Sequence, residues 1–183
     1  MRKLIIQQMV SVDGYFEGPN NELDWHVVDG EFNDFAIDAL KKIDTLIFGR
    51  ITYNLMANYW PSPAAVNDDP VVANFMNKIS KIVFSKTLEK LEWENCRLVK
   101  TDPVEEVKRL KSQKGKEIAI FGSSHLALPL IENNLIDEYR IIVNPVILGR
   151  GISLFAGTSK SSKLKLVESR IFNSGNVLLI YTP

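Results

Sequence analysis

Cysteine is nearly missing from this chain of 183 residues, which holds Cys96 and no other cysteine. A single cysteine excludes an internal disulfide and any metal site built from several thiolates, and it is typical of proteins from a reducing compartment. Long apolar runs are missing too: none approaches the length of a membrane span, and the run after Met1 is too short for a signal peptide. We therefore expect a cytoplasmic protein with no metal site and no membrane partner.

An excess of charge of either sign is also missing, because 22 Lys and Arg residues balance 22 Asp and Glu residues. This balance indicates neither a basic surface for nucleic acid nor an acidic tail. Hydrophobic residues make up 45% of the chain and charged residues 24%, which is ordinary for a globular protein. Repeats and linkers are missing, so the length favours one domain over residues 1–183.

Short apolar runs alternate with amphipathic helical patterns along the chain. Strands are predicted at 3–12, 45–48, 81–84, 96–99, 118–121 and 138–146, with a final hairpin at 164–172 and 177–181. Helices are predicted at 31–43, 51–58, 70–79, 103–114 and 125–132, and long loops at 15–25 and 58–69. This order is typical of an α/β fold with a mostly parallel central sheet, covered on both faces, and a C-terminal antiparallel hairpin.

Small or cationic residues follow three of the predicted strands directly: Gly49-Arg50, Ser85-Lys86 and Gly122-Ser123-Ser124. Ligands of open α/β sheets bind beyond the carboxyl ends of the strands. Two of these junctions lead into helices, whose first N–H groups and dipole attract anions. Taken singly, each junction could be an ordinary turn. Together they predict a ligand with several phosphates, although the Gly-x-Gly-x-x-Gly motif of the ordinary dinucleotide fold is missing.

The chain resembles the dihydrofolate reductase superfamily, and most of all the C-terminal reductase domain of the bifunctional riboflavin-biosynthesis deaminase/reductase (RibD). The likeness rests on five motifs that occur in the family's order: Val12-Asp13-Gly14, the junction from Phe48 to Thr52, Phe84-Ser85-Lys86, the stretch from Ile120 to Ser124, and Leu135 to Glu138 leading to Pro145 to Gly149. The resemblance implies the family's three-layer αβα fold, NADPH as cofactor, and a homodimer.

The resemblance also assigns cofactor-binding roles residue by residue. It places Met9 beside the nicotinamide amide, and Gly14 and Gly18 in a loop that covers the nicotinamide. It places near the pyrophosphate and the 2′-phosphate the residues Gly49, Arg50, Ile51, Thr52, Ser85 and Lys86. It places in a second phosphate cradle the residues Phe121, Gly122, Ser123, Ser124, His125 and Leu126. The loops at 13–21 and 60–69 are expected to close over the site.

On the substrate side we predict a set of aromatic residues: Trp25, Phe32, Tyr53 and Trp60. Trp25, Tyr53 and Trp60 could equally be core residues, and His26 is interpreted as an ordinary surface histidine. The catalytic proton donor is unknown: Glu31 is a weak candidate, and a water chain is the alternative.

The resulting hypothesis is an NADPH-dependent reductase that transfers a hydride to a small heterocyclic or sugar-like acceptor, similar to the 5-amino-6-(5-phosphoribosylamino)uracil reductase of riboflavin biosynthesis. The alternatives are a dihydrofolate reductase proper, a nucleotide-binding or regulatory module without turnover, and a structural homo-oligomer. The module is favoured by one departure from the family, because no carboxylate lies on the apolar face of the predicted first helix.

Overall fold

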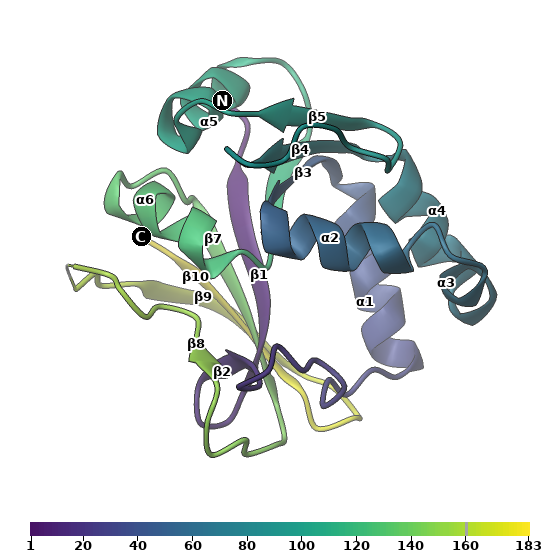
Figure 1. The fold of residues 1–183 in the computed structure, drawn as a ribbon. Helices are drawn as coiled ribbons and strands as arrows, with labels where there is room; N and C mark the ends of the chain where they lie inside the picture. Colours follow the sequence, from purple (N-terminus) through teal and green to yellow (C-terminus); the bar gives the residue numbers. More distant parts are fainter. Residues whose placement is uncertain (160) are drawn as a thin grey trace.

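A sheet of eight strands forms the middle of the molecule in the computed structural model, which describes residues 1–159 and 161–183 (Figure 1). The strands follow one another across the sheet in the order β5-β4-β3-β6-β1-β7-β10-β9. Their bounds are β1 Leu4–Ser11, β3 Ile43–Gly49, β4 Ser80–Phe84, β5 Cys96–Val99, β6 Glu117–Phe121, β7 Glu138–Asn144, β9 Lys165–Ile171 and β10 Val177–Thr182.

All pairings from β5 to β7 are parallel, and the hairpin of β9 and β10 adds to β7 in antiparallel sense. β6 and β1 lie at the centre, and Ile118, Ala119 and Ile120 are fully buried. A strand that is covered on both faces must be apolar throughout, which explains the unbroken apolar runs. The predicted sheet, mostly parallel with a C-terminal antiparallel hairpin, is confirmed.

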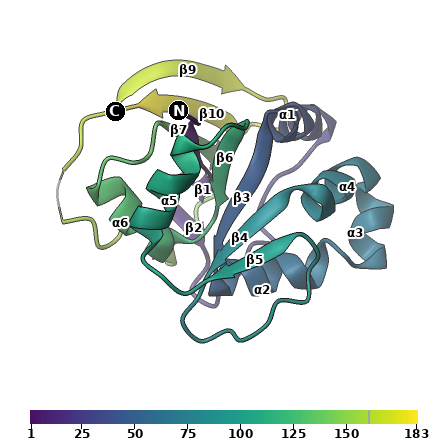
Figure 2. The ribbon, with the colours of Figure 1, turned by 90° about the horizontal axis from the view of Figure 1, so that it is seen from above.

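Helices cover both faces of the sheet (Figure 2). One face packs against α1 Gly30–Lys41, α2 Arg50–Tyr59 and α4 Pro70–Lys78, and α3 Pro63–Asp68 lies beside α4. The opposite face packs against α5 Pro103–Ser112 and α6 Ser124–Glu132. The three-layer αβα arrangement is therefore confirmed. Within the described residues, no helix is long and apolar enough to cross a membrane.

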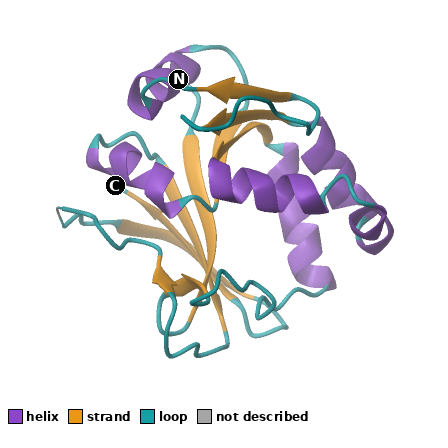
Figure 3. Ribbon diagram, viewed as in Figure 1, coloured by secondary structure: helices purple, strands orange, loops and turns teal. Residues whose placement is uncertain are grey.

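Two segments that we predicted as loops contain short regular elements (Figure 3). In the first, β2 Tyr15–Glu17 pairs with β8 Ile152–Ser153 in a small antiparallel sheet. In the second lies α3, which begins with a serine cap and a proline. Strands of three and two residues are too short to show an alternating pattern, so periodicity could not have found them.

Candidate active site

Two cavities lie side by side at the carboxyl edge of the parallel strands. The first has a volume of about 390 Å³ and the second about 310 Å³. The cavities adjoin, because they share the lining residues Glu17, Asn21, Ile51, Thr52 and Ser123. This edge of the sheet is where the strand-end motifs predicted a ligand.

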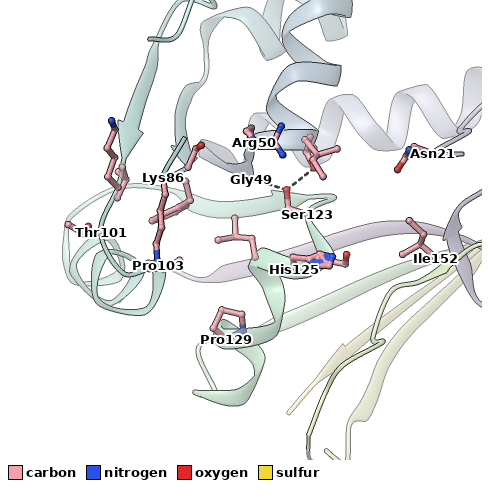
Figure 4. A pocket seen from close by; sticks show the side chains of 18 of the residues that line it. Asn21, Gly49, Arg50, Lys86, Thr101, Pro103, Ser123, His125, Pro129 and Ile152 are labelled. Carbon is pink, nitrogen blue, oxygen red and sulfur yellow. Dashed lines mark hydrogen bonds between the residues drawn. The ribbon is translucent and has the colours of Figure 1, made fainter. Parts of the chain in front are cut away.

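The first cavity lies between the N-termini of α2 and α6 and the ends of β4 and β5 (Figure 4). Three exposed cations line it: Arg50, Lys86 and Lys100. None of the three forms an ion pair with any of the described residues. The cavity therefore carries three unpaired positive charges, and Glu17 is the one acidic residue in its described lining.

The helix N-termini divide into two groups. In α1, α3, α4 and α5 a side chain caps the first turn, as when Asp29 accepts a hydrogen bond of 2.8 Å from the N–H of Phe32. Neither α2 nor α6 has a side-chain cap. Helix N-termini with free N–H groups attract anions, because the donors and the helix dipole act together. Both uncapped helices open on the first cavity, and so does the start of α5, which Asp102 caps.

A hydroxyl group links these two helix starts. Ser123 Oγ accepts a hydrogen bond of 2.8 Å from the N–H of Gly49 and donates one of 2.7 Å to Thr52 Oγ1 (Figure 4). The turn that carries it has φ of 77° at Gly122 and 69° at Ser123, both in the left-handed region. The N–H of Gly122 donates to Gln8 Oε1. These groups therefore hold the junction together, and the N–H groups that begin the helices remain for a ligand.

The second cavity lies between β1, α1 and α2, and its walls are mainly apolar. Apolar lining residues are Met9, Phe16, Leu23, Phe32, Ala36, Leu55, Met56, Phe121 and Ile142. Two buried polar atoms of its lining residues, Gln7 Oε1 and His26 Nε2, have no hydrogen-bond partner within the described chain. Burial lowers the pKa of His26 to about 4, so its imidazole is neutral at pH 7. The described lining of this cavity contains no Lys or Arg.

Glu17 lies where the two cavities meet. It is the one acidic residue among the described residues that line either cavity. Burial raises the pKa of the Glu17 carboxyl group, and the charge of nearby His125 acts in the opposite direction. The carboxyl group makes no hydrogen bond with the rest of the described chain.

Most of the predicted cofactor residues line these cavities. The first cavity is lined by Gly49, Arg50, Ile51, Thr52, Ser85, Lys86, Ser123, Ser124, His125 and Leu126. The second is lined by Met9, Phe121 and Gly122 in addition to the shared residues. Gly14 and Gly18 line neither cavity; they flank β2, which carries Glu17.

The four aromatic residues predicted for the substrate side do not come together at one cavity. Of these four, only Phe32 lines the second cavity. Tyr53 is buried in the core, where its hydroxyl accepts hydrogen bonds from the N–H groups of Glu92 and Trp93. Trp25 and Trp60 lie outside both cavities and donate their indole N–H groups to neighbours within the chain. Their apolar faces are used for packing.

The candidate proton donor Glu31 also lies outside both cavities. Its carboxylate accepts hydrogen bonds of 2.8 Å from Arg170 and from the N–H of Asn173, which ties α1 to the terminal hairpin. The bond from Arg170 holds the pKa of Glu31 below its ordinary value, so the group is a carboxylate and not an acid at pH 7. The segment 60–69 does not cover the site either, because it forms α3 beside α4.

Sequence reasoning missed Gln7, Glu17 and the half-buried position of His26, which we interpreted as a surface histidine. Gln7 stands in an apolar strand, and a polar residue there was a signal of an unusual environment. Glu17 ends a strand of three residues and His26 stands in an irregular stretch, and neither is long enough for periodicity to reveal which side chains point inward.

Known proteins of one family are similar to this chain over nearly its whole length. The RibD C-terminal domain matches residues 2–178. YyaP of Bacillus subtilis (strain 168), described as uncharacterized, is 34% identical over 186 residues, which cover 98% of this chain and 94% of that protein.

Two solved structures share the fold. One is a diaminohydroxyphosphoribosylaminopyrimidine deaminase/5-amino-6-(5-phosphoribosylamino)uracil reductase from Thermotoga maritima, with a TM-score of 0.71 and 16% identity over 100% of this chain and 56% of that chain. The other is dihydrofolate reductase from Enterococcus faecalis in complex with NADP(H) and RAB-propyl, with a TM-score of 0.66 and 19% identity over 98% and 95% of the two chains. The predicted resemblance is thus confirmed, and the chain belongs to the RibD C-terminal domain family.

Proposed function

We propose that this protein is an NADPH-dependent reductase that transfers a hydride to a small, uncharged heterocyclic or sugar-like acceptor. The observation that carries the proposal is the first cavity, on which two uncapped helix N-termini and three unpaired cations converge. Such a site suits a ligand with several phosphates. The family and the two solved structures support an oxidoreductase, since the neighbours are named as reductases and one binds NADP(H).

The residues present fit this cofactor. The N-termini of α2 and α6 would hold the pyrophosphate, and Arg50 and Lys86 would hold the 2′-phosphate. Met9 and Phe121 would lie beside the nicotinamide ring, where the first cavity passes into the second. When bound, NADPH supplies the hydride, and the protein orients the reacting groups and excludes water.

The acceptor would bind in the second cavity. Its apolar walls suit a planar ring, and Gln7 and His26 offer unpartnered polar atoms that can form hydrogen bonds with the ring edge. Because the described lining contains no cation, a phosphate group would find no charged partner there. An uncharged acceptor therefore fits better than the phosphorylated uracil after which the Thermotoga maritima enzyme is named.

Cofactor binding by Arg50→Ala tests the proposal. NADPH and NADH differ only in the 2′-phosphate, and a charge-assisted hydrogen bond contributes roughly 1.5–3 kcal/mol, which is about one to two orders of magnitude in affinity. Titration calorimetry should show that loss for NADPH and almost none for NADH. The native preference for NADPH should also shrink as salt rises, because exposed ion pairs are screened.

Lys114→Ala is the matched control, because Lys114 is an exposed cation that lines neither cavity. It should bind both cofactors like the native protein. Equal losses for NADPH and NADH in Arg50→Ala would mean that Arg50 does not read the 2′-phosphate. NADPH binding without oxidation by any uncharged carbonyl or imine would indicate a binding module.

A further inference from the structure

We infer that Glu17 is the catalytic acid that protonates the acceptor during reduction. The inference rests on the proposed function, and it names the proton source for that reaction. Reduction of a C=O or C=N bond needs a proton as well as a hydride, and a positioned acid must lie within reach of both reactants. Glu17 meets this condition by its place in the fold, since it lines the first and the second cavity at once.

No other carboxyl group in the described chain competes for the role. Every other Asp and Glu of the described residues lies outside the lining of both cavities. Glu31 in particular faces the terminal hairpin, where its carboxylate forms an ion pair with Arg170. The remaining titratable groups that line the two cavities are the cations Arg50, Lys86 and Lys100 and the histidines His26 and His125.

The local structure holds Glu17 in position without using its carboxyl group. The backbone of β2 pairs with β8, and Gly18 donates its N–H to the carbonyl of Glu22. The chain at Gly151 approaches so closely that a Cβ there would lie 2.3 Å from the carbonyl oxygen of Glu17. The carboxyl oxygens themselves have no partner in the described chain, so they are free to contact a ligand.

The surroundings of Glu17 favour the protonated form of its carboxyl group. Burial disfavours the charged carboxylate and raises the pKa of Glu17, and His125 reduces this effect because its charge favours the carboxylate.

The reduction transfers one hydride and one proton to the acceptor. The acceptor carbon gains the hydride that the cofactor loses in becoming NADP⁺, and the π electron pair of the C=O or C=N bond moves to the heteroatom. That heteroatom forms a bond to the proton of Glu17 as the O–H bond of the carboxyl group breaks. Glu17 is partly exposed, so water can return a proton to the carboxylate before the next turnover.

The first test observes the carboxyl group without turnover. Protein labelled with ¹³C at the glutamate carboxyl carbons is titrated by NMR, and Glu17→Gln assigns the signal. In the free protein we expect Glu17 to titrate above the ordinary value of 4.5. The value should rise further with NADPH bound, because the uncharged dihydronicotinamide ring removes more water from the group. A signal at or below 4.5, or one that NADPH leaves unchanged, would overturn the inference.

The second test uses kinetics, with 6-methyl-7,8-dihydropterin as an uncharged cyclic imine and a panel of small aldehydes as further acceptors. Glu17→Gln should lower kcat by about 10²- to 10⁴-fold, which is the usual contribution of a general acid. Glu17→Asp should recover part of that loss. The affinity for NADPH, measured by fluorescence titration, should change less than twofold in Glu17→Gln. The native kcat should fall as pH rises through the pKa of Glu17, and the residual kcat of Glu17→Gln should lack this fall.

Glu31→Gln is the matched control, since it makes the same change in an acid outside both cavities, and its kcat should equal that of the native protein. Circular dichroism and thermal unfolding verify that each variant is folded. Native kcat in Glu17→Gln would overturn the inference, and so would native protein that binds NADPH but reduces none of these acceptors. Native protein that binds no NADPH would instead overturn the proposed function.

Discussion

His26 carries the clearest pH dependence at the scale of single residues. Burial gives its imidazole a pKa of about 4 in the folded protein, against 6.5 in an unfolded chain. Between these values the unfolded chain binds the proton and the folded protein does not. His26 therefore contributes stability that is present above pH 6.5 and is lost as the pH falls towards 4.

We expect this contribution to reach at most about 3 kcal/mol in the free energy of unfolding, by the usual 1.36 kcal/mol for each pKa unit. Urea unfolding at pH 7 and at pH 4.5 should show a larger loss for the native protein than for His26→Phe, which keeps an aromatic ring against Trp25. Because the carboxyl groups of both proteins titrate alike, the difference isolates His26. The same pH dependence in His26→Phe would show that folding does not lower the pKa of His26.

At the scale of helices and strands, the N-termini of helices were among the features that the sequence predicted best. Asp69-Pro70 and Asp102-Pro103 predicted the beginnings of α4 and α5, because aspartate caps and proline at the first position act through neighbouring residues only. The pairing of β2 with β8 was not predictable in this way. Its partners lie more than 130 positions apart, and each strand is too short for a local preference to matter.

This small ladder also leads to a prediction for exchange experiments. An isolated pair of strands this short has little stability of its own, and it carries Glu17 at the cavity junction. We expect the amides of residues 13–21 to exchange quickly in the free protein and to become protected when NADPH binds. The amides of 60–69 should not change, because α3 lies outside both cavities. Hydrogen–deuterium exchange with mass spectrometry would measure both segments, and protection of 60–69 alone would contradict the assignment.

At the scale of the whole molecule, the two cavities differed in how well the sequence predicted them. The first cavity is formed by backbone at strand ends and helix starts, which short motifs such as Gly49-Arg50 mark directly. The second is formed by side chains from separate elements, among them Leu23, Phe32, Leu55 and Ile142. Only the folded chain brings these residues together, so sequence reasoning named Phe32, Met9 and Phe121 but missed Leu23, Leu55 and Ile142.

The edge strand β9 has features that favour the expected homodimer. β9 forms one edge of the sheet (Figure 2), and three of its apolar side chains are exposed: Leu166 by 50%, Val167 by 60% and Ile171 by 77%. Native proteins usually protect such an edge, and a second copy of the chain would do so. We propose that two copies associate through β9.

Sedimentation velocity at micromolar concentration should then show a dimer for the native protein and a monomer for a Val167→Lys, Ile171→Lys double variant. Val71→Lys serves as the control, because Val71 is 46% exposed on α4 and distant in the fold from β9. A native monomer, or a double variant that remains dimeric, would exclude association through this edge.

The close approach of Gly151 to the carbonyl of Glu17 has a consequence for the evolution of the family. Alanine at this position would push β2 away and displace the acid, although Gly151 itself lines neither cavity. Relatives that retain the acid should therefore also retain the glycine, and lineages that have lost one should have lost both. Joint inheritance of these two positions, which are separated by most of the chain, would distinguish the members that share this chemistry from those that have taken the fold to other uses.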